Sequence, residues 1–136
     1  MRRRLRVLLV EDSEADIEFT VEAFELNFPD IKLVVCETAE AALDSLESNR
    51  APHLILLDLN LPGLSGLELL AILKASDRYQ GIPVVILTTS NHDRDLSEGW
   101  RLGAAGYIVK PVDYDRFIAA LMSLGNYFFK TVTLPF

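Results

Sequence analysis

Residues 54–58 read Leu-Ile-Leu-Leu-Asp, an apolar run closed by a single acid. A short run that is apolar throughout, rather than alternating, indicates a strand buried on both faces of a parallel sheet. Asp58 comes directly after this run and before the loop Leu61-Pro62-Gly63-Leu64, so it marks the carboxyl end of the strand. Open α/β sheets bind their ligands at that end.

Three further apolar runs also end at polar residues. They are Leu5–Val10 before Glu11-Asp12, Val84–Leu87 before Thr88, and Tyr107–Val109 before Lys110. If all these runs are parallel strands, their carboxyl ends meet on one edge of the sheet and bring the polar residues together. Acids, a hydroxyl and an ammonium in one pocket form a set suited to a hard cation and a phosphoryl group.

Helical segments separate the strands. Residues that cap helix starts stand where each segment begins: Ser13, Thr38, Ser65 and Asp113. A further strand is expected at Leu33–Cys36, and Gly125-Asn126 indicates the end of the last helix. The helix at Asp93–Leu102 has the weakest pattern, because Gly99 costs about 1 kcal/mol relative to Ala. Five βα units predict an α/β fold, with a doubly wound five-stranded parallel sheet and helices on both faces.

Composition restricts the class of protein. The 136 residues are half hydrophobic and 24% charged, as in ordinary soluble proteins. A net charge of −7 disfavours nucleic acid as a direct partner, because phosphate binding needs a basic surface. No run approaches the roughly 20 apolar residues of a membrane span. The lone cysteine, Cys36, closes an apolar run, so we expect it to be buried, and a single thiol suits a reducing cytoplasm.

The chain divides into a domain at 1–126 and an extension at 127–136. The extension is rich in apolar side chains: Tyr127, Phe128, Phe129, Val132, Leu134 and Phe136. A segment this apolar is not expected to stay solvated. We therefore expect the extension to pack on its own domain or in a dimer interface.

The polar residues at the strand ends suggest specific chemistry. Glu11, Asp12 and Asp58 offer the oxygen ligands that Mg²⁺ or Mn²⁺ prefers. Asp58 is the candidate nucleophile, because a carboxylate can form an aspartyl phosphate. Lys110 would supply a positive point charge and Thr88 a hydroxyl donor to the phosphoryl oxygens.

Four motifs together carry a resemblance to a known family. They are Val-Glu-Asp-Ser at 10–13, Leu-Leu-Asp-Leu-Asn-Leu-Pro-Gly at 56–63, Ile-Leu-Thr-Thr at 86–89, and Gly-Ala-Ala-Gly-Tyr-Ile-Val-Lys-Pro at 103–111. Over essentially its whole length the chain resembles a response-regulator receiver domain of two-component signalling. The resemblance implies the strand order 2-1-3-4-5, which receivers share with flavodoxins.

The resemblance also implies roles for the acids. Asp58 would be phosphorylated by a histidine kinase. Asp12 and Asp58 would hold Mg²⁺ together with the main-chain carbonyl of Asn60. Glu11 would act on the ion mostly through water.

On the same resemblance, Lys110 would bind the phosphoryl group, often with a cis bond to Pro111 that aims the lysine. Thr88 would swing toward the phosphoryl group, and Tyr107 would turn inward into the space that Thr88 vacates. The protein would catalyse its own phosphorylation and dephosphorylation without turning over an external metabolite.

Two finer features point to a subfamily. Glu11-Asp12 replaces the commoner Asp-Asp pair, and Thr-Val-Thr-Leu-Pro at 131–135 follows an aromatic cluster. Both resemble the small, output-less regulators that pair with bacterial and cyanobacterial phytochromes. The family often has Ala where Gly99 stands here, and the bulky Trp100 follows it. We expect a cytoplasmic homodimer formed by the face from Trp100 to Leu124, by the 127–136 extension, or by both.

Other functions are also compatible with these residues. One alternative is a receiver-like binding module that works without phosphorylation. A second is a small aspartate-nucleophile phosphatase, which usually has an acid where Asn60 stands. A third is a flavodoxin-like FMN binder, which Glu-Asp-Ser-Glu at 11–14 disfavours because these acids repel phosphate. His53 and His92 lack partners at metal-ligand spacing, so we interpret them as structural or surface residues.

Overall fold

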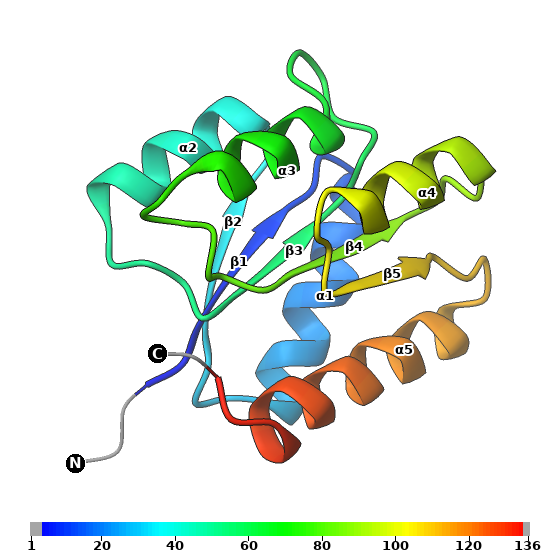
Figure 1. The fold of residues 1–136 in the computed structure, drawn as a ribbon. Coiled ribbons are helices and arrows are strands. Elements are labelled where there is room, and N and C mark those ends of the chain that lie inside the picture. The colour runs from blue at the N-terminus through cyan, green and yellow to red at the C-terminus, as the bar shows by residue number, and fades with distance from the viewer. Residues whose placement is uncertain (1–3, 135–136) are drawn as a thin grey trace.

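The computed structural model describes residues 4–134 and contains a five-stranded parallel sheet of order β2-β1-β3-β4-β5 (Figure 1). The strands are β1 Arg6–Val10, β2 Lys32–Cys36, β3 Leu54–Leu57, β4 Val84–Thr88 and β5 Gly106–Val109. The helices are α1 Glu14–Asn27, α2 Ala39–Ser48, α3 Gly66–Ala75, α4 Asp93–Arg101, α5 Tyr114–Asn126 and the π-helix η1 Tyr127–Thr131. The predicted fold class and strand order are confirmed.

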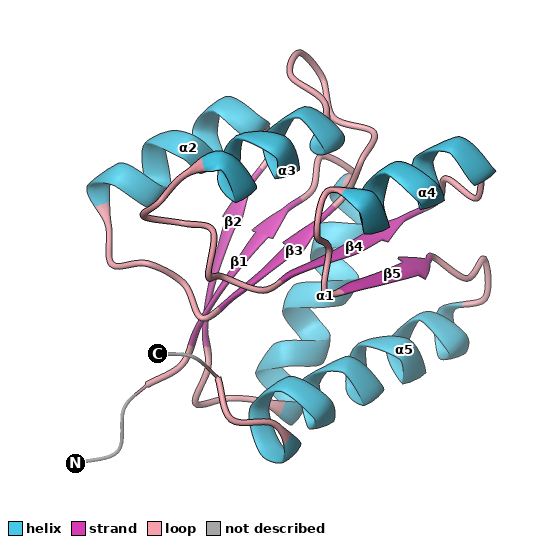
Figure 2. Ribbon diagram, viewed as in Figure 1, coloured by secondary structure: helices cyan, strands magenta, loops and turns pink. Residues whose placement is uncertain are grey.

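Helices cover both faces of the sheet, with α1 and α5 on one side and α2, α3 and α4 on the other (Figure 2). The strand side chains alternate between two main cores. Leu8, Val10, Ile55, Leu57 and Ile86 belong to the core that contains α2 and α3, whereas Val7, Leu9, Leu54, Leu56 and Val85 belong to the core that contains Phe24 and Leu124. Burial on both faces explains why these strands are apolar without alternation.

The starts of four helices could be predicted from the sequence, because N-capping depends on residue types within one turn of the helix start. Ser13, Thr38 and Asp113 accept hydrogen bonds from main-chain N–H groups in the first turns of α1, α2 and α5. Ser65 and Glu68 form a complete capping box at α3. The weakly patterned α4 does form, although His92 at its N-cap makes no capping hydrogen bond through its side chain.

Helix α5 ends at Asn126, where Gly125-Asn126 predicts it, but Gly125 does not have the positive φ of a glycine that terminates a helix. The chain continues from α5 into η1 without leaving helical backbone, and Tyr127 has right-handed helical dihedrals. Gly125 is buried inside α5, where an added Cβ would overlap the ring of Phe28. This glycine therefore permits close packing of α5 on the end of α1 rather than ending a helix.

The described part of the extension, residues 127–134, packs on its own domain through Phe129. The Phe129 ring meets Phe28 edge to face, with centroids 5.3 Å apart, and Phe24 at 6.0 Å. Tyr127, by contrast, is 54% exposed. Phe136 lies outside the described residues.

Two further expectations concern burial. Cys36 is 8% exposed in the core between the sheet and α2, as predicted. Within residues 4–134, no helix is both long and apolar enough to cross a membrane.

Candidate functional site

The carboxyl ends of β1 and β3 bring three acids together at one edge of the sheet. Glu11 and Asp12 follow β1 and Asp58 follows β3, and each offers a carboxylate oxygen within 4.8 Å of the others. Glu11 and Asp58 are buried, whereas Asp12 is exposed. Three carboxylate oxygens at this separation match what Mg²⁺ or Mn²⁺ requires, because these ions take oxygen ligands and retain waters. The donor set therefore fits a divalent cation.

Lys110 follows β5 and donates to a ring of carboxylates. Its Nζ lies 2.6 Å from Glu11 Oε2, 2.8 Å from Asp16 Oδ2 and 3.3 Å from Asp58 Oδ2. The lysine side chain is only 4% exposed, so water screens these ion pairs little. The sequence had placed Lys110 beside Glu11 and Asp58, and the geometry brings them into contact.

Asp16 was missed by the sequence reasoning. It lies in the first turn of α1, three residues after the N-cap Ser13. A usable signal existed, because the first turn of a helix that follows β1 directly remains at the carboxyl edge of the sheet. Any acid on that turn can reach the same pocket as Glu11.

The site holds one basic side chain, Lys110, and four acidic ones: Glu11, Asp12, Asp16 and Asp58. Burial raises the pKa of Glu11 from 4.5 to about 7, and the hydrogen bond from Lys110 does not offset this. Burial alone would lower the pKa of Lys110, but its hydrogen bonds to Asp16 and Glu11 raise it above the ordinary value. Lys110 therefore stays protonated, whereas burial disfavours the charged form of Glu11 in the absence of a cation. This is the electrostatic condition that favours binding of a divalent ion.

Asp58 and the loop that follows it are held by hydrogen bonds of Asn60 and by the close approach of α3. The N–H of Asn60 donates to Asp58 Oδ1 at 3.2 Å, and the Asn60 side chain donates to Thr89 Oγ1 at 3.4 Å. Gly66, at the start of α3, lies so close that an added Cβ would overlap the carbonyl oxygen of Asp58. The loop after β3 is thus fixed at both of its ends.

Thr88 is the last residue of β4 and is fully buried. Its carbonyl accepts from the N–H of Lys110 at 2.7 Å, which sets Lys110, the first residue after β5, beside the end of β4. Its hydroxyl oxygen accepts from the N–H of Ser90 at 3.4 Å. Thr88 therefore contacts both Lys110 in the acidic pocket and Ser90 in the loop before α4.

Tyr107 lies on β5 and is partly buried. Its hydroxyl donates to the carbonyl of Ser90, and its ring lies against α4 at Gly99. An added Cβ at Gly99 would come within 2.8 Å of Ile86 Cδ1 and 3.2 Å of the Tyr107 ring. The glycine at this position therefore makes room for Tyr107 beneath α4, which gives the departure from Ala a physical reason.

One expectation that followed from the resemblance is wrong in this structure. Every peptide bond within residues 4–134 is trans, including the bond from Lys110 to Pro111. Lys110 reaches all its carboxylate partners from this trans backbone.

The histidines take no part in the site. His53 is buried and its Nδ1 accepts from the N–H of Arg6 at 3.0 Å, while His92 is exposed before α4. Both residues behave as predicted.

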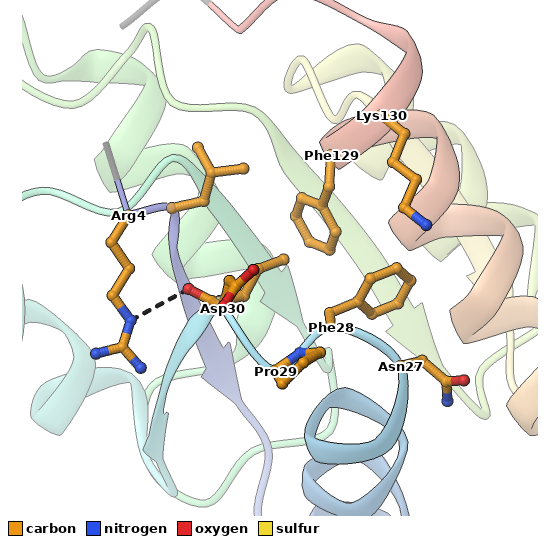
Figure 3. A pocket seen from close by; sticks show the side chains of 9 residues that line it. Arg4, Asn27, Phe28, Pro29, Asp30, Phe129 and Lys130 are labelled. Atoms are coloured by element: carbon orange, nitrogen blue, oxygen red, sulfur yellow. Dashed lines mark hydrogen bonds between the residues drawn. The ribbon is translucent and has the colours of Figure 1, made fainter. Parts of the chain in front are cut away.

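A pocket of about 600 Å³ lies at the other end of the sheet (Figure 3). Its lining comes from the residues before β1, the end of α1 with the loop after it, and η1: Arg4, Leu5, Asn27, Phe28, Pro29, Asp30, Ile31, Phe129 and Lys130. Arg4 crosses one side and donates to the carbonyl of Asp30 at 3.1 Å. None of the acids bound to Lys110 reaches this pocket, so it is separate from the candidate site.

Comparison with known proteins identifies the class to which this fold and site belong. Residues 7–122 match the response regulator receiver domain family. The chain belongs to that family.

Individual relatives are similar over nearly the whole chain. Response regulator Rcp1 from Synechocystis is 35% identical over 135 residues, which covers 95% of this chain and 92% of the relative. The crystal structure of the phosphorylated cyanobacterial phytochrome response regulator RcpA superimposes with a TM-score of 0.94 at 31% identity, covering 98% of this chain and 100% of RcpA. The Mn²⁺-bound form of Rcp1 superimposes with a TM-score of 0.92 at 34% identity, covering 97% and 99%.

Proposed function

We propose that this protein is a response regulator that accepts a phosphoryl group on Asp58 from a sensor histidine kinase. The observation that carries the proposal is the pairing of Lys110 with Asp58 and Glu11 in a buried acidic pocket at the carboxyl edge of the sheet. An acid at a strand end is commonly a helix cap. A buried lysine bound to several of them is not explained by capping.

The reaction transfers a phosphoryl group from the imidazole of a phosphohistidine to the carboxylate of Asp58. A carboxylate oxygen of Asp58 forms a bond to phosphorus as the phosphorus–nitrogen bond of the donor phosphohistidine breaks, and the imidazole leaves with that electron pair. Lys110 is already 3.3 Å from Asp58, so it is placed to neutralise the phosphoryl oxygens that arrive there. Phosphoryl transfer depends mainly on such positioning and charge.

Mg²⁺ is the proposed cofactor, with Mn²⁺ able to replace it. Asp12, Asp58 and the main-chain carbonyl of Asn60 would hold the ion, and Glu11 would act mostly through water. The bound ion would supply positive charge to the phosphoryl oxygens. The acid cluster and the Mn²⁺-bound relative Rcp1 support this assignment.

Phosphorylation would act as a switch through Thr88 and Tyr107. The Thr88 hydroxyl would move toward the phosphoryl group and release the loop that contains Ser90. Tyr107 would then turn further inward, since its hydroxyl is bonded to that same loop. A change in charge at Asp58 would thereby bias the surface formed by α4 and β5.

The partners follow from the relatives and from the surface. The similarity to the cyanobacterial phytochrome response regulator RcpA favours a phytochrome-type sensor kinase as the phosphoryl donor. Apolar side chains exposed between α4 and α5 suit a homodimer contact, namely Trp100, Val109, Val112 and Tyr114. We place the protein in the cytoplasm, without turnover of any external metabolite.

The decisive experiment compares the wild type with Asp58→Asn in the presence of Mg²⁺ and acetyl phosphate. The wild type should gain one phosphoryl group by intact mass, and Asp58→Asn should gain none. Asp77→Asn, which changes an exposed loop acid, is the matched control and should react normally. Labelling of Asp58→Asn would refute the assignment, and steady release of phosphate from a monoester would favour a phosphatase instead. Gel filtration of the same samples would test the dimer and its response to phosphorylation.

A further inference from the structure

Asp16 differs from the other carboxylates that Lys110 contacts. Glu11 and Asp58 both belong to the cluster that fits a cation, and Asp16 does not. Asp16 also comes from a helix rather than a strand end, and its side chain is 25% exposed. Its distance to Lys110 Nζ is nevertheless 2.8 Å, shorter than the 3.3 Å from Lys110 to Asp58.

The first turn of α1 fixes where the Asp16 carboxylate lies. The main-chain N–H of Asp16 donates to Ser13 Oγ at 3.4 Å. Its carbonyl accepts from the buried hydroxyl of Thr20 at 2.7 Å. Both bonds use main-chain atoms, so the carboxylate itself is left for Lys110. A side-chain substitution at Asp16 leaves both bonds in place.

The three hydrogens of the Lys110 ammonium match its three acceptors. Two of these acceptors acquire other partners during the proposed cycle: Asp58 becomes joined to phosphorus, and Glu11 serves the cation. Asp16 has neither task. It is the acceptor that Lys110 can keep in every state of the site.

We propose that Asp16 is a positioning residue that anchors the Lys110 ammonium throughout the phosphorylation cycle. This inference rests on the proposed function. The anchor has two consequences for the chemistry. It keeps the ammonium at the distance where phosphoryl oxygens arrive, and it draws the lysine away from the acids that the cation needs.

Loss of Asp16 should therefore affect two measurements. Without it, Lys110 has only Glu11 and Asp58 as partners and competes with the cation for both. Mg²⁺ should bind more weakly in Asp16→Ala, by about three- to tenfold. Phosphorylation by acetyl phosphate at saturating Mg²⁺ should also slow by about tenfold, because the ammonium is less well placed.

Glu14→Ala is the matched control. Glu14 lies in the same first turn, carries the same charge, and makes no side-chain contact with Lys110 within the described residues. It therefore reproduces the loss of one negative charge near the helix N-terminus. Calorimetric titration with Mg²⁺ alone should show a change of less than about twofold in Glu14→Ala. Cooperative urea unfolding would confirm that both variants fold.

Repeating both substitutions in a Lys110→Met variant separates the anchoring of Lys110 by Asp16 from the mere loss of a negative charge. If Asp16 acts through Lys110, adding Asp16→Ala there should weaken Mg²⁺ binding no more than adding Glu14→Ala does. The inference is overturned if the two alanine variants behave alike with Lys110 present, or if their difference persists without it. Failure of the wild type to accept a phosphoryl group would overturn the proposed function instead. The Mg²⁺ titrations would still test whether Asp16 anchors Lys110.

Discussion

The hydroxyl of Tyr107 donates a hydrogen bond of 2.9 Å to the main-chain carbonyl of Ser90. This bond joins β5 to the loop that follows Thr88. Ser90 extends the link, because its own hydroxyl donates to Asp95 in the first turn of α4 at 2.6 Å. The loop next to the acidic pocket is thus tied to both elements of the proposed output surface.

Tyr107→Phe removes the hydrogen bond and leaves the ring in place. We expect the free energy of unfolding to fall by about 1 kcal/mol, the usual contribution of one such bond. The rate of phosphorylation by acetyl phosphate should change by less than about twofold, since Tyr107 touches none of the acids. Urea unfolding and intact-mass kinetics measure the two quantities. A large loss of phosphorylation rate would show that Tyr107 takes part in the chemistry rather than in the response.

Glu11 should make the metal-free protein sensitive to pH. Its pKa is raised by burial to about 7 from 4.5, so the folded state holds a proton that the unfolded state releases. The contribution of Glu11 to the free energy of unfolding should therefore be highest below pH 4.5 and should decline as the pH rises toward 7. The loss is on the order of 1 to 3 kcal/mol.

Glu11→Gln isolates this effect because glutamine cannot titrate. Urea unfolding from pH 5 to pH 8 without metal should show the wild type losing stability relative to Glu11→Gln. Saturating Mg²⁺ should reduce the difference, because the ion supplies the positive charge that ionised Glu11 lacks. Parallel pH profiles for the two proteins would contradict the prediction.

Gly66→Ala should disturb the proposed phosphorylation site although Gly66 is not part of it. The new methyl group would overlap the carbonyl oxygen of Asp58, so either the loop after β3 or the start of α3 has to move. We expect a loss of about 1 to 3 kcal/mol in stability together with weaker Mg²⁺ binding. Gly106→Ala is the control: its Cβ would find its nearest neighbour, a methyl of Val85, at an ordinary 3.5 Å. Equal effects in both variants would mean that the close approach at Gly66 is not what matters.

Phe129→Ala tests whether the extension stabilises the domain. Phe129 contributes edge-to-face contacts to Phe24 and Phe28, so its removal should lower the free energy of unfolding by roughly 1 to 3 kcal/mol. Tyr127→Ala, at an exposed neighbour, should lower it by less than about 1 kcal/mol. Equilibrium unfolding of both variants at a fixed protein concentration compares them directly. If Tyr127→Ala proves the more damaging, the extension serves another contact.

The order of elements and the residues at the strand ends could be predicted because both depend on local patterns. A run such as Leu54–Leu57 is apolar because two helix layers cover it, and the polar residue that follows must lie at the sheet edge. Once the strands are parallel, Glu11, Asp58 and Lys110 meet there by topology alone. Caps such as Ser65 are equally local, since the hydrogen bonds span three residues.

Contacts between distant segments could not be predicted in the same way. The hydrogen bond that Lys110 donates to Asp16 joins residues 94 positions apart and depends on how α1 is placed against the end of β5. Gly125 resembled a helix end because its contact with Phe28 is invisible in the flanking residues. Gly99 looked like a weakness of α4 for the same reason. Its role depends on Ile86 and Tyr107, which lie on other elements.

The burial of Cys36 has a practical consequence for experiments on this protein. Its thiol is the only one in the chain, it is 8% exposed, and burial raises its pKa. The thiolate is the nucleophile that attacks an alkylating reagent, so the native cysteine should react slowly while the protein is folded. In a Tyr127→Cys variant the exposed new thiol would take up a fluorophore or spin label before Cys36 does. Because Cys36 would take up little label, the native cysteine need not be removed before the extension is followed spectroscopically during phosphorylation by acetyl phosphate.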